Sequence, residues 1–287
     1  MFGQHQALTS AYGLTYTPND TLSYTTAFEV GTIQDNFEND FDRRALSLGV
    51  RYQDEALTAS GRIEYRTEAG LLSGEQVSAN TLLIAANAAY KFDDVQRVLF
   101  SADLAQSETD ESAILDGDYA DVVLGYAYRP IDDDRLNILA RYRYLYDMFG
   151  QRVDDVDESG PRQRSHVISI DASYDLSRTW TIGGKLGYRI SETAATDTAA
   201  FVQSDAWLVV ANARMHLVHD WDILLEAREL GTVQPQGRDF GVLAAAYKQL
   251  GNNLEIGLGY NFGQISDDLT DLTDNSQGAF INLIAKF

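Results

Sequence analysis

The sequence predicts an all-β fold: a transmembrane, antiparallel up-and-down β-barrel of about 14–16 strands, with residues 1–287 forming a single domain. Three observations predict it. Segments of roughly ten residues, about fifteen in all, alternate apolar and polar side chains with a period of two. Short and long connections between these segments alternate strictly along the chain. The alternation also continues through residues 279–287 and stops on Phe287, although chain termini normally fray into solvent.

The bulk composition is consistent with strands, and not helices, as the elements that cross a membrane. The hydrophobic fraction is an ordinary 45%, as expected if only alternate residues of each strand face lipid. No run of eighteen apolar residues occurs, so no spanning helix is predicted. The longest apolar stretches, 81–90 and 206–213, each have the length of one strand.

The net charge indicates which partners the chain can bind, and the amino-terminal residues indicate whether a signal peptide is present. A formal net charge of −21 excludes nucleic acid as a partner, because nucleic acid requires a basic face. Residues 1–5 do not combine a basic region with an apolar core, so they do not form a signal peptide. A membrane barrel must nevertheless be exported. We therefore expect the chain to be a mature form or the carboxyl-terminal part of a longer precursor.

The predicted strands follow one another along the whole chain. In the first clear example, Leu22, Tyr24 and Phe28 alternate with Ser23, Thr25 and other residues of the opposite register. The same pattern recurs with no helical period between the segments, most clearly at 22–31, 57–66, 136–144, 180–189, 221–228 and 254–262. Many such segments in series predict an antiparallel meander.

The connections between these segments sort by length. Short turns are expected at 18–20, 53–55, 93–94, 131–134, 175–178, 218–220 and 251–253. Longer links are expected at 34–42, 68–75, 107–118, 148–164, 192–204, 231–238 and 265–277. Short turns on one side and long loops on the other are typical of membrane barrels, whereas a two-sheet sandwich has no reason to sort its links. The longest link, 148–164, is the candidate for a constriction of the lumen.

The ending of the chain carries a family resemblance. Phe287 follows apolar residues at alternate positions, Ala285, Leu283 and Ile281, and this strand resembles the last strand of bacterial outer-membrane β-barrel proteins, including porins. In that family the barrel-assembly machinery reads the last strand. The resemblance therefore implies that these four residues are an assembly signal, and that outer-membrane lipid and lipopolysaccharide surround the barrel. Residues 259–262 and 266–272, with the final strand, also look like carboxyl-terminal barrels of very large exported proteins, which implies an upstream passenger region.

The resemblance also implies an orientation. Phe287 is expected at the periplasmic rim, because the last strand follows a long link, and the long acidic loops are expected outside the cell. Counting back through about fifteen strands places the first residues on the extracellular side. Single-chain bacterial barrels have even strand numbers with both termini inside. We therefore expect either a missing strand upstream of Met1 or a compact start within residues 1–6.

The candidate functional residues are the charged side chains on the strand positions opposite the apolar ones. Arg or Lys facing hydrocarbon costs about 2–4 kcal/mol at the midplane, so these charges must face water or each other. A barrel of this size is too wide for side chains alone to fill. The inward charged side chains are therefore either fixed charges that line a pore or members of cross-strand ion pairs that brace the wall. The predicted pore-lining residues are Arg51, Arg62, Glu64, Arg66, Lys91, Arg141, Arg143, Lys185, Arg189, Arg214, Glu226, Arg228 and Glu255.

No metal site, cofactor or catalytic residue is predicted. Acidic clusters in links 35–42, 108–118, 154–158 and 267–274 supply oxygen ligands, but none has the spacing of an EF-hand loop. His216 is expected to face inward beside Arg214, without a recognisable Ser/His/Asp arrangement. We therefore interpret the chain as a non-enzymatic outer-membrane barrel that anchors a larger exported protein and encloses a water-filled pore. The alternatives are a free-standing diffusion porin with a charged lumen and, third, a barrel hydrolase.

Overall fold

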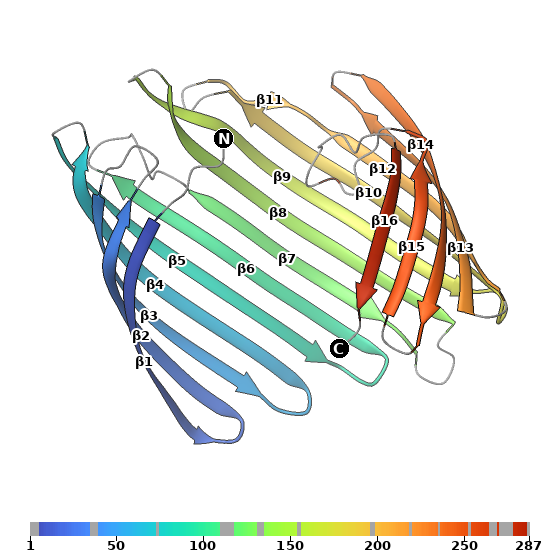
Figure 1. The fold of residues 1–287 in the computed structure, drawn as a ribbon, viewed down its shortest axis with the longest axis horizontal. Coiled ribbons are helices and arrows are strands. Elements are labelled where there is room, and N and C mark those ends of the chain that lie inside the picture. Colours follow the sequence, from blue (N-terminus) through green and yellow to red (C-terminus); the bar gives the residue numbers. More distant parts are fainter. Residues whose placement is uncertain are drawn as a thin grey trace.

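The computed structural model describes residues 6–34, 40–72, 75–109, 118–130, 135–153, 156–195, 199–217, 220–234, 236–251, 254–263, 269 and 278–285. Within these residues the chain forms one antiparallel β-sheet, which curls as in Figure 1. No helix among them is long and apolar enough to span a membrane. The strands are β1 (Gln6–Asn19), β2 (Leu22–Gln34), β3 (Asp40–Gln53), β4 (Leu57–Leu72), β5 (Glu75–Lys91), β6 (Gln96–Thr109), β7 (Tyr119–Tyr128), β8 (Leu136–Val153), β9 (Val156–Asp175), β10 (Trp180–Ala194), β11 (Val202–Gln203), β12 (Ala206–His216), β13 (Trp221–Thr232), β14 (Gly237–Leu250), β15 (Leu254–Asn261) and β16 (Gly278–Ala285).

The strands pair in chain order, which confirms the predicted all-β, up-and-down architecture. Each strand is hydrogen-bonded to the next one along the chain, from β1 to β16, and β11 alone stands off this path. Both β11 and β12 pair with β10, so together they occupy a single position in the sheet. The described residues therefore contain sixteen strands in fifteen successive positions, within the predicted range.

The first and last strands, β1 and β16, form the two edges of the sheet. In the part of the chain that the structure describes, β1 pairs only with β2, and β16 pairs only with β15. Figure 1 shows β1 (blue) and β16 (red) at opposite margins of the curl, with their arrows pointing toward the same end. This shared direction follows from the odd number of positions in an alternating sheet. It matches the parity that the sequence predicts.

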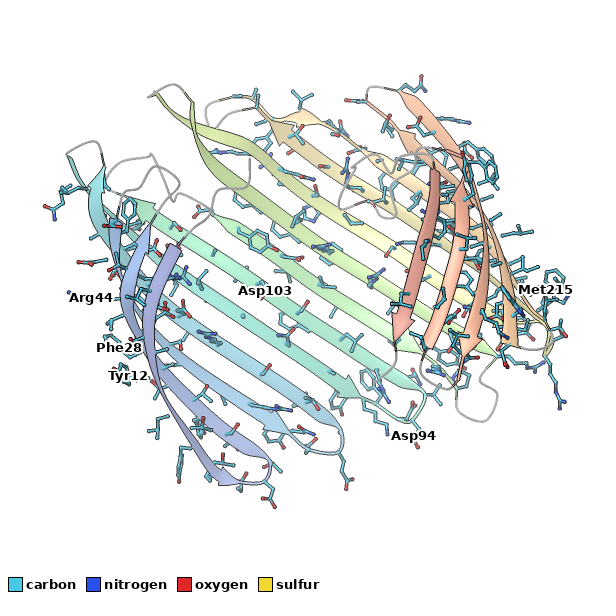
Figure 2. All side chains as sticks on the ribbon, in the orientation of Figure 1. Tyr12, Phe28, Arg44, Asp94, Asp103 and Met215 are labelled. Atoms are coloured by element: carbon cyan, nitrogen blue, oxygen red, sulfur yellow. The ribbon has the colours of Figure 1, made fainter. Side chains whose placement is uncertain are left out.

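The register places the apolar side chains of successive strands on one face. In the β9–β10 hairpin, Ile168 lies opposite Tyr188 and Ile170 opposite Leu186. Ile168 is 55% exposed and Leu186 is 58% exposed, far more than a water-soluble sheet leaves uncovered. Figure 2 places Tyr12 and Phe28 at the outer margin of the curl and Asp103 within it. This outer face is a continuous apolar surface of the kind that lipid covers.

The short turns are fixed by side chains that accept hydrogen bonds from the backbone. Asp54 accepts from the backbone N–H of Ala56 (2.8 Å) and of Leu57 (2.6 Å). Asp93 accepts in the same way from Val95 and Gln96. Such Asx turns close a hairpin over few residues. Bonds to the charged carboxylate stabilise it, so Leu57 N–H first, then the Tyr52 hydroxyl and Ala56 N–H, lower the pKa of Asp54.

Two of the predicted long links are wrong, because strands continue through them. β8 runs to Val153 and β9 begins at Val156, so most of residues 148–164 is paired strand and not a loop. Link 68–75 is likewise taken up by the ends of β4 and β5. Acidic side chains suggest loops because they are costly in lipid, but a hairpin that extends beyond the membrane meets water on both faces. Segment 148–164 is therefore not the predicted constriction loop.

Candidate functional site

The thirteen predicted pore-lining residues all lie on the face opposite the apolar surface, which we call the inner face. Ladder partners share a face, and the ladder through Arg143, Val167 and Arg189 runs across β8, β9 and β10. The ladders place the remaining members at positions of the same parity on their own strands. The sequence alternation therefore assigned each of these side chains to its correct face. The register fixes the face of these side chains and not their role.

On β2, β3 and β4 the inner charges neutralise one another. Glu64 is buried and accepts hydrogen bonds from Arg62 and from Arg66 Nη2, the latter at 2.8 Å. Arg43 Nε lies 3.5 Å from a Glu29 carboxylate oxygen and 3.4 Å from one of Glu68. Here the interpretation as bracing cross-strand ion pairs fits the geometry.

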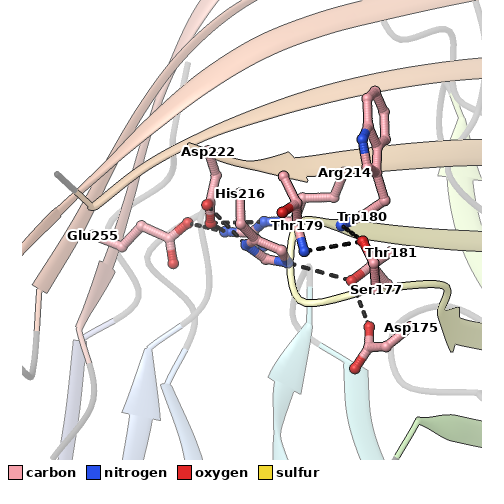
Figure 3. A network of polar contacts seen from close by, with 9 residues as sticks. All are labelled: Asp175, Ser177, Thr179, Trp180, Thr181, Arg214, His216, Asp222 and Glu255. Atoms are coloured by element: carbon pink, nitrogen blue, oxygen red, sulfur yellow. Dashed lines mark hydrogen bonds and ion pairs between the residues drawn. The ribbon is translucent and has the colours of Figure 1, made fainter. Parts of the chain in front are cut away.

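A second charge network joins β12, β13 and β15 next to the short turns (Figure 3). Arg214 donates through Nε (2.9 Å) and Nη2 (2.5 Å) to Asp222 Oδ2, and through Nη2 to Glu255 Oε1 (2.6 Å). His216 Nδ1 lies 2.9 Å from Asp222 Oδ1. In the next row, Arg228 Nε donates to Glu226. The register brings these groups together from three strands, a pairing that strand alternation alone does not reveal.

The His216 network links a carboxylate, an imidazole and a hydroxyl, as a hydrolase site does. The hydroxyl proton, however, is directed away from the imidazole. His216 bridges Asp222 and the Thr181 hydroxyl, whose oxygen lies 3.3 Å from Nε2. Thr181 Oγ1, however, donates its single proton to Asp175 Oδ1 at 2.5 Å. His216 Nε2 must then act as a donor to Thr181, and it cannot accept the proton of a nucleophile. The arrangement therefore does not support the hydrolase alternative.

Leu269, a described residue of link 265–277, reaches the inner face, and strand alternation does not predict this contact. Leu269 is only 2% exposed and packs in an apolar cluster, with Arg189 Nη1 donating to its carbonyl oxygen at 3.3 Å. The cluster partners of Leu269 are Val167, Ala206, Leu208 and Leu230, from three strands of one wall, β9, β12 and β13. Gly187 makes room for it, since a Cβ there would lie 2.8 Å from Leu269 Cδ1. A single leucine among Asp267, Asp268 and Asp271 is the signal that could have identified this contact.

A hollow of about 550 Å³ extends along the inner face from β6 to β13. Charged side chains of both signs line it: Asp171, Lys185, Glu226 and Arg228. The remaining predicted residues contact their neighbours singly: Arg51 donates to Gln53, Lys91 contacts Asp94, and Arg141 lies 3.3 Å from Asp171. Arg143 binds Asp121 in bidentate fashion, through Nε and Nη2 at 2.7 Å each. The inner face is thus polar, charged and hollow.

Comparison with known proteins supports the same architecture. No family model and no curated protein sequence matches the chain. Among solved structures, the ferric citrate transporter FecA in the unliganded form matches with 14% identity and a TM-score of 0.56, over 97% of this chain and 52% of FecA. The ferric-catecholate import receptor Fiu from E. coli K12, in its open form, matches with 8% identity and a TM-score of 0.58, over 90% of this chain and 58% of Fiu.

The chain has the fold of a bacterial outer-membrane β-barrel. It spans between about half and three fifths of the length of the two receptors that it matches.

In this outer-membrane barrel the predicted assembly signal is described only in part. Ile281 and Leu283 lie on the outer face of β16 and are 78% and 64% exposed. Ala285 ends β16, and Phe287 lies outside the described residues. Most residues of the predicted acidic loop clusters also lie outside them, at 35–39, 110–117, 154–155, 264–268 and 270–277. Within the described residues no group of three or more His, Asp or Glu side chains is placed to hold a metal ion.

Proposed function

We propose that the chain is an outer-membrane barrel that encloses a water-filled pore with a charged inner wall. The single observation that carries this proposal is the 550 Å³ hollow on the inner face, lined by Asp171, Lys185, Glu226 and Arg228. Charges on alternate strand positions require water on that side, while the opposite face is apolar and exposed. A sheet of this many strands is too wide for side chains to fill.

A pore also requires that the edges of the sheet be joined in the membrane. Unpaired N–H and C=O groups on an edge strand that faces hydrocarbon cost several kcal/mol each. The edges are β1 and β16, and every described side chain of β1 from position 8 onward is exposed. We propose that this edge is covered in the native membrane, which makes the curled sheet a continuous wall.

The orientation and the anchoring role are part of the same proposal. β16 ends at the rim that carries the short turns, which favours a periplasmic carboxyl terminus and acidic links outside the cell. The ending of the chain resembles carboxyl-terminal barrels of exported proteins, which favours an anchor for an upstream passenger region. Anchoring does not compete with a pore, because one barrel can serve both.

Planar-bilayer recording of the full chain tests the pore. The protein is refolded into detergent, and its insertion into vesicles is verified by protection from added protease. The proposal predicts stable conductance steps in KCl. An inserted but electrically silent barrel would contradict the pore and leave the anchor as the function.

A further inference from the structure

A second, smaller cavity lies on the inner wall directly beneath Leu269. Its volume is about 90 Å³, and β7, β8, β9 and β10 supply its walls. A single ordered water needs roughly 10–15 Å³ of such space, so the cavity holds several waters or one small ion. Three cations line it, Arg141, Arg143 and Lys185, together with the hydroxyl-bearing Ser169. The other described lining residues are two valines and Leu269, so the described part of the lining contains no carboxylate.

The acids that orient the two arginines stand outside the described lining. Asp121 accepts hydrogen bonds from Nε and Nη2 of Arg143. Asp171 makes one contact with Arg141 Nη2, at 3.3 Å, which is longer than a strong charge-assisted hydrogen bond. Both guanidinium groups are therefore held beside the cavity, and Arg141 is held by the weaker contact.

Lys185 is the cation that most needs a further partner. It is half-buried, and among the described residues it forms no ion pair, although Asp171 is its ladder neighbour on β9. The Asp171 carboxylate turns to Arg141 instead. A partly desolvated ammonium without a counter-charge favours binding of an anion.

We propose that this cavity binds a small oxyanion, a phosphate or carboxylate group, as a solute passes through the pore. The inference rests on the proposed pore function and names the solute class that this part of the inner wall recognises. Arginine forks match the planar oxygen pairs of carboxylates and the faces of phosphates, Lys185 supplies a point charge, and Ser169 donates a hydroxyl. Leu269 forms an apolar roof over the cavity, and a low local dielectric strengthens such interactions.

Block of the KCl current by inorganic phosphate tests the site, with succinate as the carboxylate arm. We expect concentration-dependent block by at least one of the two, which identifies the source of the oxyanion. Lys185→Gln should raise the half-blocking concentration by about tenfold, the loss of one charge-assisted contact. Lys185→Arg, which restores the charge, should recover most of the block. Far-UV circular dichroism and protease protection establish that each variant is folded and inserted.

The matched control is Lys248→Gln, the same charge change on the outer face, where Lys248 lies 5.5 Å over the Trp221 ring. It should leave the half-blocking concentration within about twofold of the original. The site would be overturned if Lys185→Gln had the same half-blocking concentration as the unaltered protein. It would also be overturned if Lys248→Gln raised that concentration as much as Lys185→Gln does. If no variant conducts, the pore fails, and calorimetric titration of phosphate and succinate into the detergent-folded protein decides the site separately. Heat released by the unaltered protein and lost in Lys185→Gln supports it, and no heat overturns it.

Discussion

Two regions of the inner face differ sharply in what covers them. We call the inner face of β9, β10, β12 and β13 the covered wall and that of β1 and β2 the open wall. On the covered wall Ala206, Leu208 and Arg189 are 0%, 1% and 3% exposed, values typical of a soluble protein core. On the open wall the inner residues of β1 from position 9 onward, such as Thr9 and Thr15, are all exposed.

The inner face of the sheet is therefore asymmetric. Both walls obey the same strand alternation, but among the described residues it is the covered wall that receives a side chain from a loop, Leu269. The open wall carries small inner residues such as Ala11 and Gly13. These residues are exposed and leave open space beside the wall. Stability and any constriction should therefore be concentrated on one side of the barrel.

The largest expected effect comes from removing the centre of the covered wall. Leu208→Ala should lower the free energy of unfolding by about 2–5 kcal/mol, because the cavity cannot collapse between paired strands. Thr15→Ala on the open wall should change it by no more than about 0.5 kcal/mol. Urea unfolding in lipid vesicles measures both. Equal losses at the two positions would remove the contrast between the walls.

The next effect tests a buried polar contact on the covered wall. The Ser165 and Ser191 hydroxyls lie 2.7 Å apart, and each residue is 1% exposed. Ser191→Ala should cost about 1–3 kcal/mol, since it leaves the Ser165 hydroxyl buried without this partner. The double variant Ser165→Ala with Ser191→Ala should cost less than the sum of the single ones. Strict additivity in the same unfolding measurement would show that the hydroxyls do not interact.

A smaller effect on stability should follow from displacing the loop. Gly187→Ala puts a Cβ 2.8 Å from Leu269 Cδ1, so the Leu269 side chain must shift, and its packing should weaken by about 1 kcal/mol. Gly13→Ala is the matched change on the open wall, where the nearest atom to a new Cβ is 3.6 Å away. It should be neutral. Fluorescence of a dye attached at an introduced Leu272→Cys should report release of the link in the first variant alone.

The smallest effect concerns the β3–β4 turn, which lies beyond both walls. Hydrogen bonds lower the pKa of Asp54 in the folded protein below its ordinary value of 3.8. The turn therefore gains stability from the charged carboxylate above pH 3.8, and loses it as the pH falls through the lower, folded pKa. Asp54→Asn should be slightly less stable than the unaltered protein at pH 7, and the gap should close in acid. A gap that widens below pH 3.8 would show the opposite sign of the shift.

Much of the fold could be predicted because a strand pattern is local. The alternation of Leu22, Tyr24 and Phe28 fixes two faces without knowledge of any other strand, and this sufficed to place all thirteen predicted inner residues. The extent of strands was harder to predict. Residues 148–153 and 156–164 pair beyond the apolar stretch, because backbone hydrogen bonds do not require apolar side chains.

The site was less predictable because it depends on register between strands and on one loop contact. The sequence does not state which row of β8 meets which row of β9, so the convergence of Arg141, Arg143 and Lys185 could not be foreseen. The contact of Leu269 joins residues far apart in the chain, such as Arg189. A leucine in an acidic link, such as Leu269 or Leu272, indicates an apolar contact but neither which leucine makes it nor its partner.

Because Leu269 packs on the covered wall, it should narrow the proposed water-filled pore from that side. Single-channel recording of Leu269→Ala beside the unaltered protein tests it most directly, with Leu14→Ala on the outer face as the matched control. We predict stable steps for all three proteins, larger for Leu269→Ala and unchanged for Leu14→Ala. Silent bilayers with inserted protein, or equal step sizes for Leu269→Ala and the unaltered chain, would contradict the claim.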